Sequence, residues 1–341
     1  MKAFILAAGV GNRLKPLTYH LPKPMVPILN KPALWHIISN MQASGITDIM
    51  LNLHYRPDVI KNYFGSSFKN VELSYSIEKK LLGTAGAIKK NESFFDNTFI
   101  VMSGDGLSGI NLKKLVNFHK KKKALATVVL KKVDACFDYG VGITCSQGRI
   151  TKFVEKPSWE SVFSNTVNTG IYVFEPEIFN YIPKNKFHDF GANLLPLLLR
   201  KNLPVYGYEM GDYWTDIGNL KEYKEGICAA LGKKVKTQID GVQIKRGVWA
   251  HKTSRISPAA RIKAPCIIGE NCTIESGVTI KPYCVIGNNV TVKKGAVLTK
   301  TTVWDGAVIG EKTHLENSII GYNEVVAGGI RLFDSVMMSN R

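Results

Sequence analysis

An apolar residue recurs at every sixth position in the C-terminal part of the 341-residue chain. A second row of small apolar residues runs four positions later, and the register slips by one residue after Leu298. A six-residue period is typical of a parallel β-helix, in which each hexad forms one face of a coil around a narrow core. The period therefore predicts a β-helix over residues 251–341. The first row consists of Ile256, Ile262, Ile268, Ile274, Ile280, Ile286, Val292 and Leu298.

Three of the six cysteines, Cys266, Cys272 and Cys284, fall in the second row of this repeat. No pair of cysteines has the Cys-x-x-Cys spacing that is typical of zinc sites and thioredoxin-like redox motifs. We therefore expect these three thiols to fill the core of the β-helix.

Strand-like and helix-like segments alternate in the first part of the chain. Short apolar runs predict strands, and Pro32–Ala43 carries apolar side chains at helical spacing. This order predicts an α/β domain with a mostly parallel, doubly wound sheet over residues 1–230, joined to the β-helix by a linker over 231–250. Ligands of such sheets bind beyond the carboxyl ends of the strands. The predicted strands are Lys2–Ala8, Asp48–Leu53, Val71–Ile77, Thr98–Met102 and Ala124–Val133.

The formal net charge of +18 raises nucleic acid as a partner. The lysines are spread along the chain, and the one dense run, Lys120–Lys123, is expected to be the solvated end of a helix. We therefore expect phosphorylated small molecules rather than nucleic acid as partners. No apolar run approaches the roughly 18–20 residues that span a bilayer, and Gly11-Asn12-Arg13 interrupts the apolar start too early for a signal peptide. A cytoplasmic protein without a membrane segment is expected.

A glycine-containing turn, Ala8-Gly9-Val10-Gly11-Asn12-Arg13, follows the first predicted strand. Glycines let a backbone approach a phosphate, and Arg13 adds a permanently charged fork. The turn matches neither the dinucleotide fingerprint nor the Walker A pattern, so an ordinary strand–helix turn remains an alternative. Lys23 stands between two prolines, which restrict the backbone and make the lysine a cation of low conformational freedom.

Two carboxylates follow apolar or aromatic segments. Asp105 comes after the strand Thr98–Met102, and Asp216 follows Tyr213-Trp214-Thr215. Two aspartates and substrate phosphates make an octahedral Mg²⁺ site. Each aspartate alone is equally consistent with a helix cap, so the metal site requires that the two meet in space.

Seven motifs stand along the chain in this order: Gly9–Thr18, Leu21–Pro24, Glu78 with Leu82–Gly86, Gly104-Asp105, Phe153–Pro157, Val167–Gly170 and Trp214–Gly218. In these motifs and their order the chain resembles the sugar-phosphate nucleotidylyltransferase family. Within that family it resembles the bacterial mannose-1-phosphate guanylyltransferases that carry a left-handed β-helix. This resemblance implies a Rossmann-like mixed sheet, the nucleotidyltransferase fold, followed by a left-handed β-helix of hexapeptide repeats.

The resemblance also implies a reaction and roles for matching residues. A sugar 1-phosphate would attack the α-phosphorus of a nucleoside triphosphate, and pyrophosphate would leave. Such an enzyme works by positioning and by charge neutralisation. Arg13, Lys23, Asp105 and Asp216 would be catalytic, the two aspartates as Mg²⁺ ligands. The nucleotide would contact Ala8, Gly9, Gly11, Asn12, Arg13, Lys23, Glu78, Gly83, Thr84 and Gly104, and the sugar phosphate would contact Gly140, Glu155, Lys156, Asn168 and Thr169.

Glu78 bears on the choice of base. A carboxylate only accepts hydrogen bonds, and guanine presents two adjacent donors where uracil and thymine present one. If Glu78 faces the base, GTP is the expected nucleotide and mannose 1-phosphate the expected sugar, by resemblance. The alternative for Glu78 is a glutamate exposed to solvent at a strand end. The alternatives for the substrates are UTP or dTTP with glucose 1-phosphate, and GTP with a heptose 1-phosphate.

Several positions depart from the pattern of the resembled family. Gly109 and Asn111 stand where relatives often carry acidic residues. Where relatives often have Ser-Lys-Asp, this chain has Gly191, Ala192 and Asn193. These departures bear on substrate preference and rate more than on the type of reaction. A non-catalytic, sugar-nucleotide-binding regulatory subunit is an alternative, although the retention of Arg13, Lys23, Asp105, Lys156 and Asp216 argues against it. An acyltransferase is a further alternative for a hexad β-helix, but His251 and His314 lack a companion motif. Stacking of β-helices between subunits leads us to expect a homo-oligomer.

Overall fold

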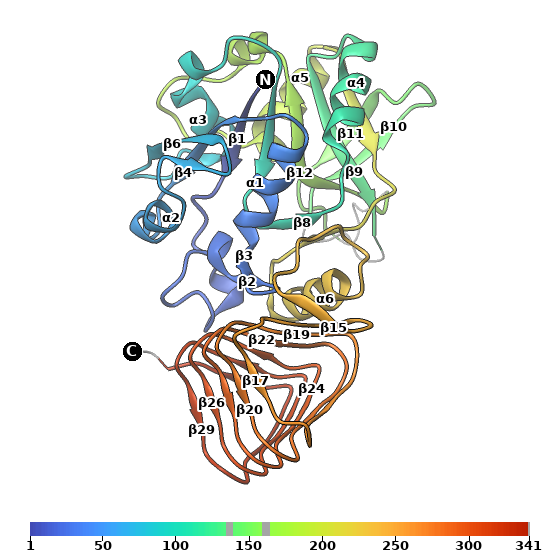
Figure 1. Cartoon of the computed structure of the whole chain (residues 1–341). Helices are drawn as coiled ribbons and strands as arrows, with labels where there is room; N and C mark the ends of the chain where they lie inside the picture. The colour runs from blue at the N-terminus through green and yellow to red at the C-terminus, as the bar shows by residue number, and fades with distance from the viewer. Residues whose placement is uncertain (134–138, 159–163, 340–341) are drawn as a thin grey trace. The chain divides into compact units, whose positions relative to one another are not determined.

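The computed structural model of the chain describes residues 1–133, 139–158 and 164–339. By compactness the chain divides into two units, each described here by itself (Figure 1). The first unit comprises residues 1–10, 22–25 and 37–216, and the second comprises residues 11–21, 26–36 and 217–341. Cys136 lies outside the described residues.

The first unit is built on a ten-stranded mixed sheet, which confirms the α/β class. Its main path runs β11-β10-β12-β7-β1-β4-β6-β5, and β9 pairs with β12 and β13. The pairs β1–β4, β1–β7 and β4–β6 are parallel, whereas β12 is antiparallel to β7 and to β9. The strands are β1 (Lys2–Leu6), β4 (Asp48–Leu53), β5 (Ser67–Phe68), β6 (Val71–Ile77), β7 (Phe99–Ser103), β9 (Ala126–Lys132), β10 (Val141–Thr144), β11 (Ile150–Val154), β12 (Thr166–Phe174) and β13 (Val205–Glu209).

Helices alternate with the strands as expected. The helix α1 and the apolar strand β7 lie where the sequence predicted them, with ends shifted by one residue. Lys120–Lys122 form the last turn of α4, as predicted for that basic run. The helices are α1 (Ala33–Ala43), α2 (Pro57–Phe64), α3 (Gly83–Lys90), α4 (Leu112–Lys122), α5 (Leu195–Arg200) and α6 (Leu220–Leu231).

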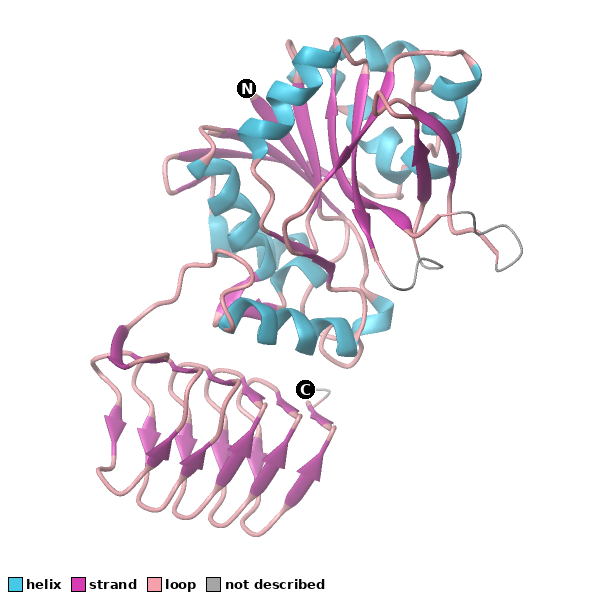
Figure 2. Cartoon of the chain, turned by 90° about the vertical axis from the view of Figure 1, so that its right-hand side faces the viewer, coloured by secondary structure: helices cyan, strands magenta, loops and turns pink. Residues whose placement is uncertain are grey.

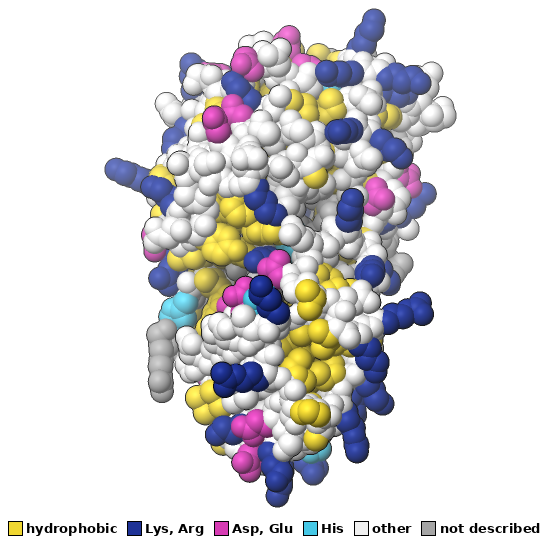
Figure 3. All heavy atoms as spheres, viewed as in Figure 1, with side chains coloured by type: hydrophobic (Ala, Val, Ile, Leu, Met, Phe, Trp, Pro, Cys, Tyr) yellow, Lys and Arg dark blue, Asp and Glu magenta, His cyan; other side chains and the backbone are white. Residues whose placement is uncertain are grey.

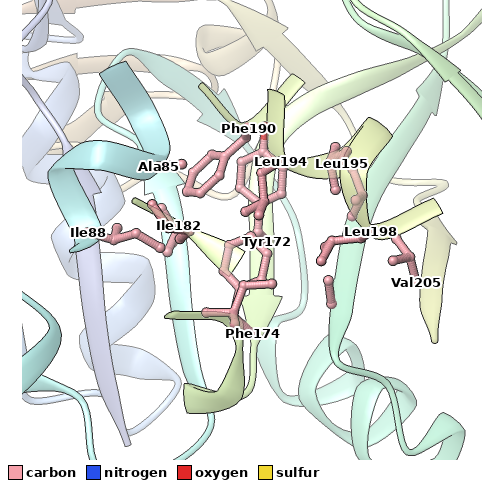
Figure 4. Close-up of a cluster of buried hydrophobic side chains, with 14 of the residues drawn as sticks. Ala85, Ile88, Tyr172, Phe174, Ile182, Phe190, Leu194, Leu195, Leu198 and Val205 are labelled. Carbon is pink, nitrogen blue, oxygen red and sulfur yellow. The ribbon is translucent and has the colours of Figure 1, made fainter. Parts of the chain in front are cut away.

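A core of aromatic and aliphatic side chains fixes the sheet of the first unit (Figure 4). Tyr172 and Phe174, two residues apart on β12, point to the same face of the sheet because side chains alternate along a strand. Both pack against the ring of Phe190, with ring centroids 4.7 and 5.2 Å from it. Figure 4 shows Leu194, Leu195 and Leu198 lining the same core. This core anchors β12, whose other residues reach the candidate site.

The repeat region folds as a parallel β-helix, consistent with the predicted left-handed one. Three sheets form its faces, all parallel except for one antiparallel pair at the start of the first, and the coils stack side by side (Figure 2). The first sheet contains β15 (Val242–Lys245), β16 (Val248–Ala250), β19 (Cys266–Ile268), β22 (Cys284–Ile286), β25 (Thr302–Val303), β28 (Ile319–Ile320) and β31 (Val336–Met337). The second contains β17 (Arg255–Ile256), β20 (Thr273–Ile274), β23 (Thr291–Val292), β26 (Val308–Ile309) and β29 (Val325–Val326). The third contains β18 (Arg261–Ile262), β21 (Thr279–Ile280), β24 (Val297–Thr299), β27 (His314–Glu316) and β30 (Arg331–Phe333).

The hexad rows form the core of this β-helix. Cys266, Cys272 and Cys284 are buried there, and burial raises the pKa of Cys266 and of Cys284 to about 12. Thiols with such high pKa values stay protonated and act as small apolar side chains, as predicted. Ile256 and Ile262, at the start of the row, are only partly buried.

The register slip predicted after Leu298 is present in the β-helix. Ile256 pairs with Ile274, but Ile286 pairs with Val303, so later coils are one residue shorter. One feature was not expected: β16 pairs in parallel with β19 although it lies within the expected linker 231–250. The domain boundaries at 230 and 251 therefore stay a proposal.

Candidate active site

Lys23, Asp105 and Asp216 form a cluster in the first unit, hereafter the acid–lysine cluster. The Nζ atom of Lys23 donates to Asp105 Oδ2 and, at 3.0 Å, to Asp216 Oδ1. Strands β8 (Gly106–Ser108) and β14 (Trp214–Asp216) bring the two acids together, because they pair antiparallel with Asp216 opposite Gly106. The convergence on which the sequence argument depended is present.

The charges of this cluster stabilise one another. Burial alone raises the pKa of Asp105, but the Lys23 ammonium and the Ser103 hydroxyl outweigh that cost and lower the pKa. Burial likewise lowers the pKa of Lys23, and the charges of Asp105 and Asp216 outweigh it and raise the pKa. Both partners therefore stay charged at neutral pH.

The backbone around Lys23 holds its side chain in place. Lys23–Met25 form a short 3₁₀ turn, in which the amide of Met25 donates to the carbonyl of Pro22 at 2.8 Å. Only 9% of Lys23 is exposed. A lysine this buried needs paired anions, and the two aspartates supply them.

The two aspartates fit a divalent ion. Both carboxylates are already within hydrogen-bond reach of a single positive nitrogen, so they can face one cation. Carboxylate oxygens are the donors that Mg²⁺ prefers, and Mg²⁺ commonly takes one or two carboxylates with water and phosphate oxygens. Across residues 1–133, 139–158 and 164–339, no group of three or more His, Cys, Asp or Glu side chains is placed to hold a metal. The fit therefore requires ligands from substrate and water.

Gly104 lets β7 continue into the cluster beside β1. Its amide donates to the carbonyl of Leu6 at 2.9 Å, and a Cβ at this position would lie 2.9 Å from the same oxygen. Gly9 follows Ala8 beyond the end of β1, and a Cβ on Gly9 would meet nothing within 4 Å. The turn at Gly9 thus has open space beside it, as a phosphate-binding backbone requires.

A hollow of about 150 Å³ adjoins the acid–lysine cluster. Four of the five predicted sugar-phosphate residues line it, together with both aspartates. Ser103, Tyr139, Gly170 and Trp214 also line it, and sequence reasoning assigned them no role. The four predicted residues are Gly140, Glu155, Asn168 and Thr169.

Hydrogen bonds fix the strand β12 where it borders the hollow. The Asn168 amide donates to the carbonyl of Gly140 at 2.7 Å, and its side chain donates to the hydroxyl of Tyr172 at 2.6 Å. Thr169 Oγ1 donates to the carbonyl of Val129 at 2.9 Å, and the indole of Trp214 donates to the Thr169 carbonyl at 3.2 Å. These bonds set the orientation of the side chains that a sugar would meet.

The carboxylate of Glu155, which lines the hollow, has a raised pKa. Burial, and then the charge of Asp189, raise the pKa of Glu155, while Lys156 lowers it. A Cβ on Gly140 would lie 2.5 Å from Glu155 Oε2, so Gly140 has no room for a side chain. Lys156, the fifth predicted sugar-phosphate residue, is exposed and does not line the hollow.

The burial of Glu78 excludes one of its two interpretations from the sequence. Only 3% of Glu78 is exposed, so it is not a strand-end glutamate in solvent. Asn52 donates to its Oε1 at 2.8 Å, and the Leu82 amide donates to its Oε2 at 3.0 Å. Asn52 in turn accepts from the amide of Ala7 at 2.9 Å. Glu78 therefore ties the end of β1 to the start of α3, and its two acceptor oxygens already have partners.

The neighbouring motif residues pack against another segment of the first unit. Gly83 has a φ of +75°, and a Cβ there would lie 2.5 Å from the carbonyl oxygen of His188. Thr84 Oγ1 donates to Asp189 at 2.8 Å and accepts from the amide of Phe190 at 2.7 Å. These contacts explain the glycine and the threonine without a nucleotide. A contact with the base stays a prediction.

Gly11, Asn12 and Arg13 belong to the second unit. Gly11 adopts a φ of +72°, which favours glycine, and Asn12–Leu14 form a 3₁₀ turn. Asn12 and Arg13 are exposed. Their approach to a triphosphate stays a prediction.

Two departures from the family pattern have structural roles. Asn111 caps α4, because its side chain accepts from the amide of Lys114 at 3.0 Å. Asn193 accepts from the amide of Asp189 at 2.8 Å, and Asp189 accepts from the amides of Gly191 and Ala192. The amide of Gly109 donates to the carbonyl of Tyr213 at 2.9 Å.

Comparison with known proteins identifies the family. The chain matches the family described as "Nucleotidyl transferase" over residues 2–232. It belongs to that family. Residues 262–340 of this nucleotidyltransferase also match the "GMPPB C-terminal domain".

Named relatives differ in their substrates. A UTP–glucose-1-phosphate uridylyltransferase from Synechocystis is 36% identical, over 94% of this chain and 87% of its own length. A mannose-1-phosphate guanyltransferase from Aspergillus oryzae is 33% identical, over 97% of this chain and 89% of its own length. A crystal structure described as a putative glucose-1-phosphate thymidylyltransferase from Bacillus anthracis, in complex with a sucrose, is 26% identical. It superposes with a TM-score of 0.63 over 70% of this chain and 97% of that one.

Lysine and arginine side chains are scattered over the face seen in Figure 3 rather than gathered in one patch. None of the helices in the described part of the nucleotidyltransferase has the length and apolar character needed to cross a membrane.

Proposed function

We propose that this nucleotidyltransferase transfers guanosine monophosphate from GTP to mannose 1-phosphate, forming GDP-mannose and pyrophosphate. The observation that carries the proposal is the acid–lysine cluster at the border of a hollow lined by predicted sugar-binding residues. The hollow and the cluster share Asp105 and Asp216, so a sugar phosphate in the hollow would present its phosphate to the cluster.

The reaction needs no protein nucleophile. An anionic oxygen of the sugar 1-phosphate attacks the α-phosphorus and forms a new P–O bond. The bond between the α-phosphorus and the bridging oxygen breaks, and pyrophosphate leaves with that electron pair. Catalysis then depends on alignment and on neutralising the charge of two substrates.

Each part of the site has a task in this reaction. Asp105 and Asp216 would hold Mg²⁺, which when bound supplies positive charge to the phosphate oxygens. Lys23 provides a further positive charge at the same place, and Arg13 is proposed to bind the triphosphate. Glu155 would accept a hydrogen bond from a sugar hydroxyl, and Lys156 would pair with the sugar phosphate. Asn168 and Thr169 border the sugar.

The choice of base rests on the relatives rather than on Glu78. Guanine is supported by the named guanyltransferases, such as the one from Aspergillus oryzae, and by the match of residues 262–340. The 36% identity to the Synechocystis enzyme favours a second candidate, transfer of uridine monophosphate to glucose 1-phosphate. The cytoplasmic location and the homo-oligomer expected from the sequence stay predictions.

A substrate matrix tests both candidates. GTP, UTP, dTTP and ATP are each combined with mannose, glucose and heptose 1-phosphates in the presence of Mg²⁺, and pyrophosphate release is measured. The highest kcat/KM is expected for GTP with mannose 1-phosphate. A higher value for UTP with glucose 1-phosphate selects the second candidate, and no release with any pair supports the regulatory subunit.

Arg13→Ala tests the turn Ala8–Arg13 as the proposed phosphate loop. Loss of a charge that stabilises the transition state is expected to cost about 3–4 kcal/mol, by analogy with a lost oxyanion donor. Lys15→Ala, two residues away and also exposed, is the matched control and should have little effect. Near-normal turnover of Arg13→Ala would show that the loop does not hold the triphosphate.

A further inference from the structure

A second hollow, of about 320 Å³, lies within the second unit. It lies between the segment that follows the phosphate loop and the last coils of the β-helix. This volume is at the lower end of the roughly 300–1,000 Å³ that small-molecule sites occupy. Its lining consists of Leu17, His20, Leu21, Trp304, Tyr322, Asn323, Glu324, Met338 and Ser339. None of these residues belongs to the acid–lysine cluster or to the first hollow.

The walls of this hollow suit a flat, uncharged ring. Tyr322 is 40% exposed, and the buried ring of Trp304 supports its ring from one side, with centroids 4.7 Å apart and planes tilted by 54°. Leu21 and Met338, both partly exposed, add aliphatic surface. Aromatic and aliphatic surfaces of this kind stack on a planar heterocycle.

The polar groups of the hollow favour a ligand that donates hydrogen bonds. Glu324 is only 6% exposed, and one of its oxygens accepts from the amide of Ser339. A carboxylate has about four lone-pair sites, so further donors can be accommodated. His20 Nε2 is buried and has no hydrogen-bond partner within residues 1–133, 139–158 and 164–339. A buried polar nitrogen of this kind is costly unless a ligand or water satisfies it.

We propose that this hollow binds the base of a purine nucleoside, with guanine preferred because its ring N–H and amino group are adjacent donors for Glu324. The ring would stack on the exposed face of Tyr322, and the ribose would point to solvent. This site is separate from the proposed catalytic site, and the proposal does not depend on the reaction assigned there.

The hollow is directly connected to the phosphate loop. Leu17 lines it, and the amide of Leu17 donates to the carbonyl of Leu14 at 3.0 Å. The hydroxyl of Thr18 donates to the carbonyl of Gly11 at 2.9 Å. A ligand that contacts Leu17, His20 and Leu21 therefore stabilises the same turn that carries Gly11 and Arg13.

Binding of guanosine to the full chain, measured by isothermal titration calorimetry, tests the proposal. Glu324→Gln and Tyr322→Leu are each expected to bind one guanosine fewer per chain than the wild type, or to bind that guanosine at least tenfold more weakly. Glu316→Gln changes an exposed glutamate of the same β-helix and should bind as the wild type does. Melting curves verify that each variant is folded, and the isosteric glutamine side chain in Glu324→Gln can still accept from the amide of Ser339.

Hydrogen exchange gives a second readout. Guanosine is expected to slow amide exchange over residues 11–21 in the wild type and not in Glu324→Gln. Equal guanosine binding by the wild type and both hollow variants overturns the proposal. Equal binding of uridine at this site overturns the assignment to a purine. Pyrophosphate release by the same preparations reports separately on the catalytic proposal.

Discussion

Strands that pair in the first unit are separated by much longer stretches of chain than strands that pair in the β-helix. In the β-helix each strand pairs with the strand one coil away, as Ile280 pairs with Leu298. In the first unit β8 pairs with β14, more than a hundred residues later, and this pairing brings Asp105 to Asp216. Stability in the β-helix is thus spread over many similar contacts, while the chemistry of the first unit is concentrated in a few contacts between distant segments.

The largest effect is expected from removing one acid of the cluster. Asp216→Asn keeps the size and a hydrogen bond to Lys23 but loses the charge that we propose holds Mg²⁺, so turnover should fall on the order of 10³-fold, about 4 kcal/mol. Pyrophosphate release at saturating Mg²⁺ is the measurement. Asp96→Asn, an exposed aspartate paired with Lys2, serves as the control and should leave turnover unchanged. Turnover near the wild-type value in Asp216→Asn would remove the acid pair from the mechanism.

A substitution in the core of the β-helix should lower stability and leave turnover unchanged. Ile280 is fully buried, so Ile280→Ala is expected to lower the free energy of unfolding by about 3 kcal/mol through lost burial and a cavity. Turnover per folded molecule should not change. Chemical denaturation and steady-state kinetics measure the two quantities, with Thr279→Ala on the same strand as the control. A tenfold fall in kcat of the folded variant would show that the repeats take part in catalysis.

Glu78→Gln distinguishes a base contact from a structural tie. Glutamine has only one acceptor oxygen. Its NH₂ group would therefore face the donor from Asn52 or the donor from Leu82, and the free energy of unfolding should fall by about 1–3 kcal/mol. The sequence argument instead expects preference to relax towards UTP or dTTP. Denaturation and the nucleotide matrix, with the exposed Glu72→Gln as control, separate the two. Relaxed selectivity at unchanged stability would restore Glu78 as the base-binding group.

The smallest effect concerns a departure from the family. Asn111→Ala removes the cap of α4 and should lower the free energy of unfolding by about 1 kcal/mol. Asn111→Asp retains an acceptor for the Lys114 amide and should preserve stability. Neither variant should alter kcat. A change of kcat in Asn111→Asp would mean that the charge at this position matters for the reaction.

The β-helix could be predicted almost residue by residue, because its hexad period states directly which side chains enter the core. Cys272 and Cys284 were assigned to that core from spacing alone, and the structure buries both. The slip after Leu298 was also visible in the period, and it appears as shorter later coils. The strand β16 was not predicted, because a strand without a hexad partner leaves no periodic signal.

In the first unit the sequence indicated which residues converge but not what surrounds them. Lys23 and the two aspartates were recognised by their motifs, and the structure brings them together. Tyr139 and Trp214 were missed as lining residues, since their place follows from strand pairing between distant segments. Glu78 was recognised as a motif residue, but hydrogen bonds to Asn52 and Leu82 depend on tertiary contacts that no local pattern records.

The lysine between the two aspartates has a consequence for how this protein matures. A newly made chain that has met no divalent ion already carries an internal cation paired with both acids, which leaves the cluster with a single net negative charge. Folding therefore does not have to wait for the proposed magnesium ion, and a chelator should halt turnover while leaving the chain folded.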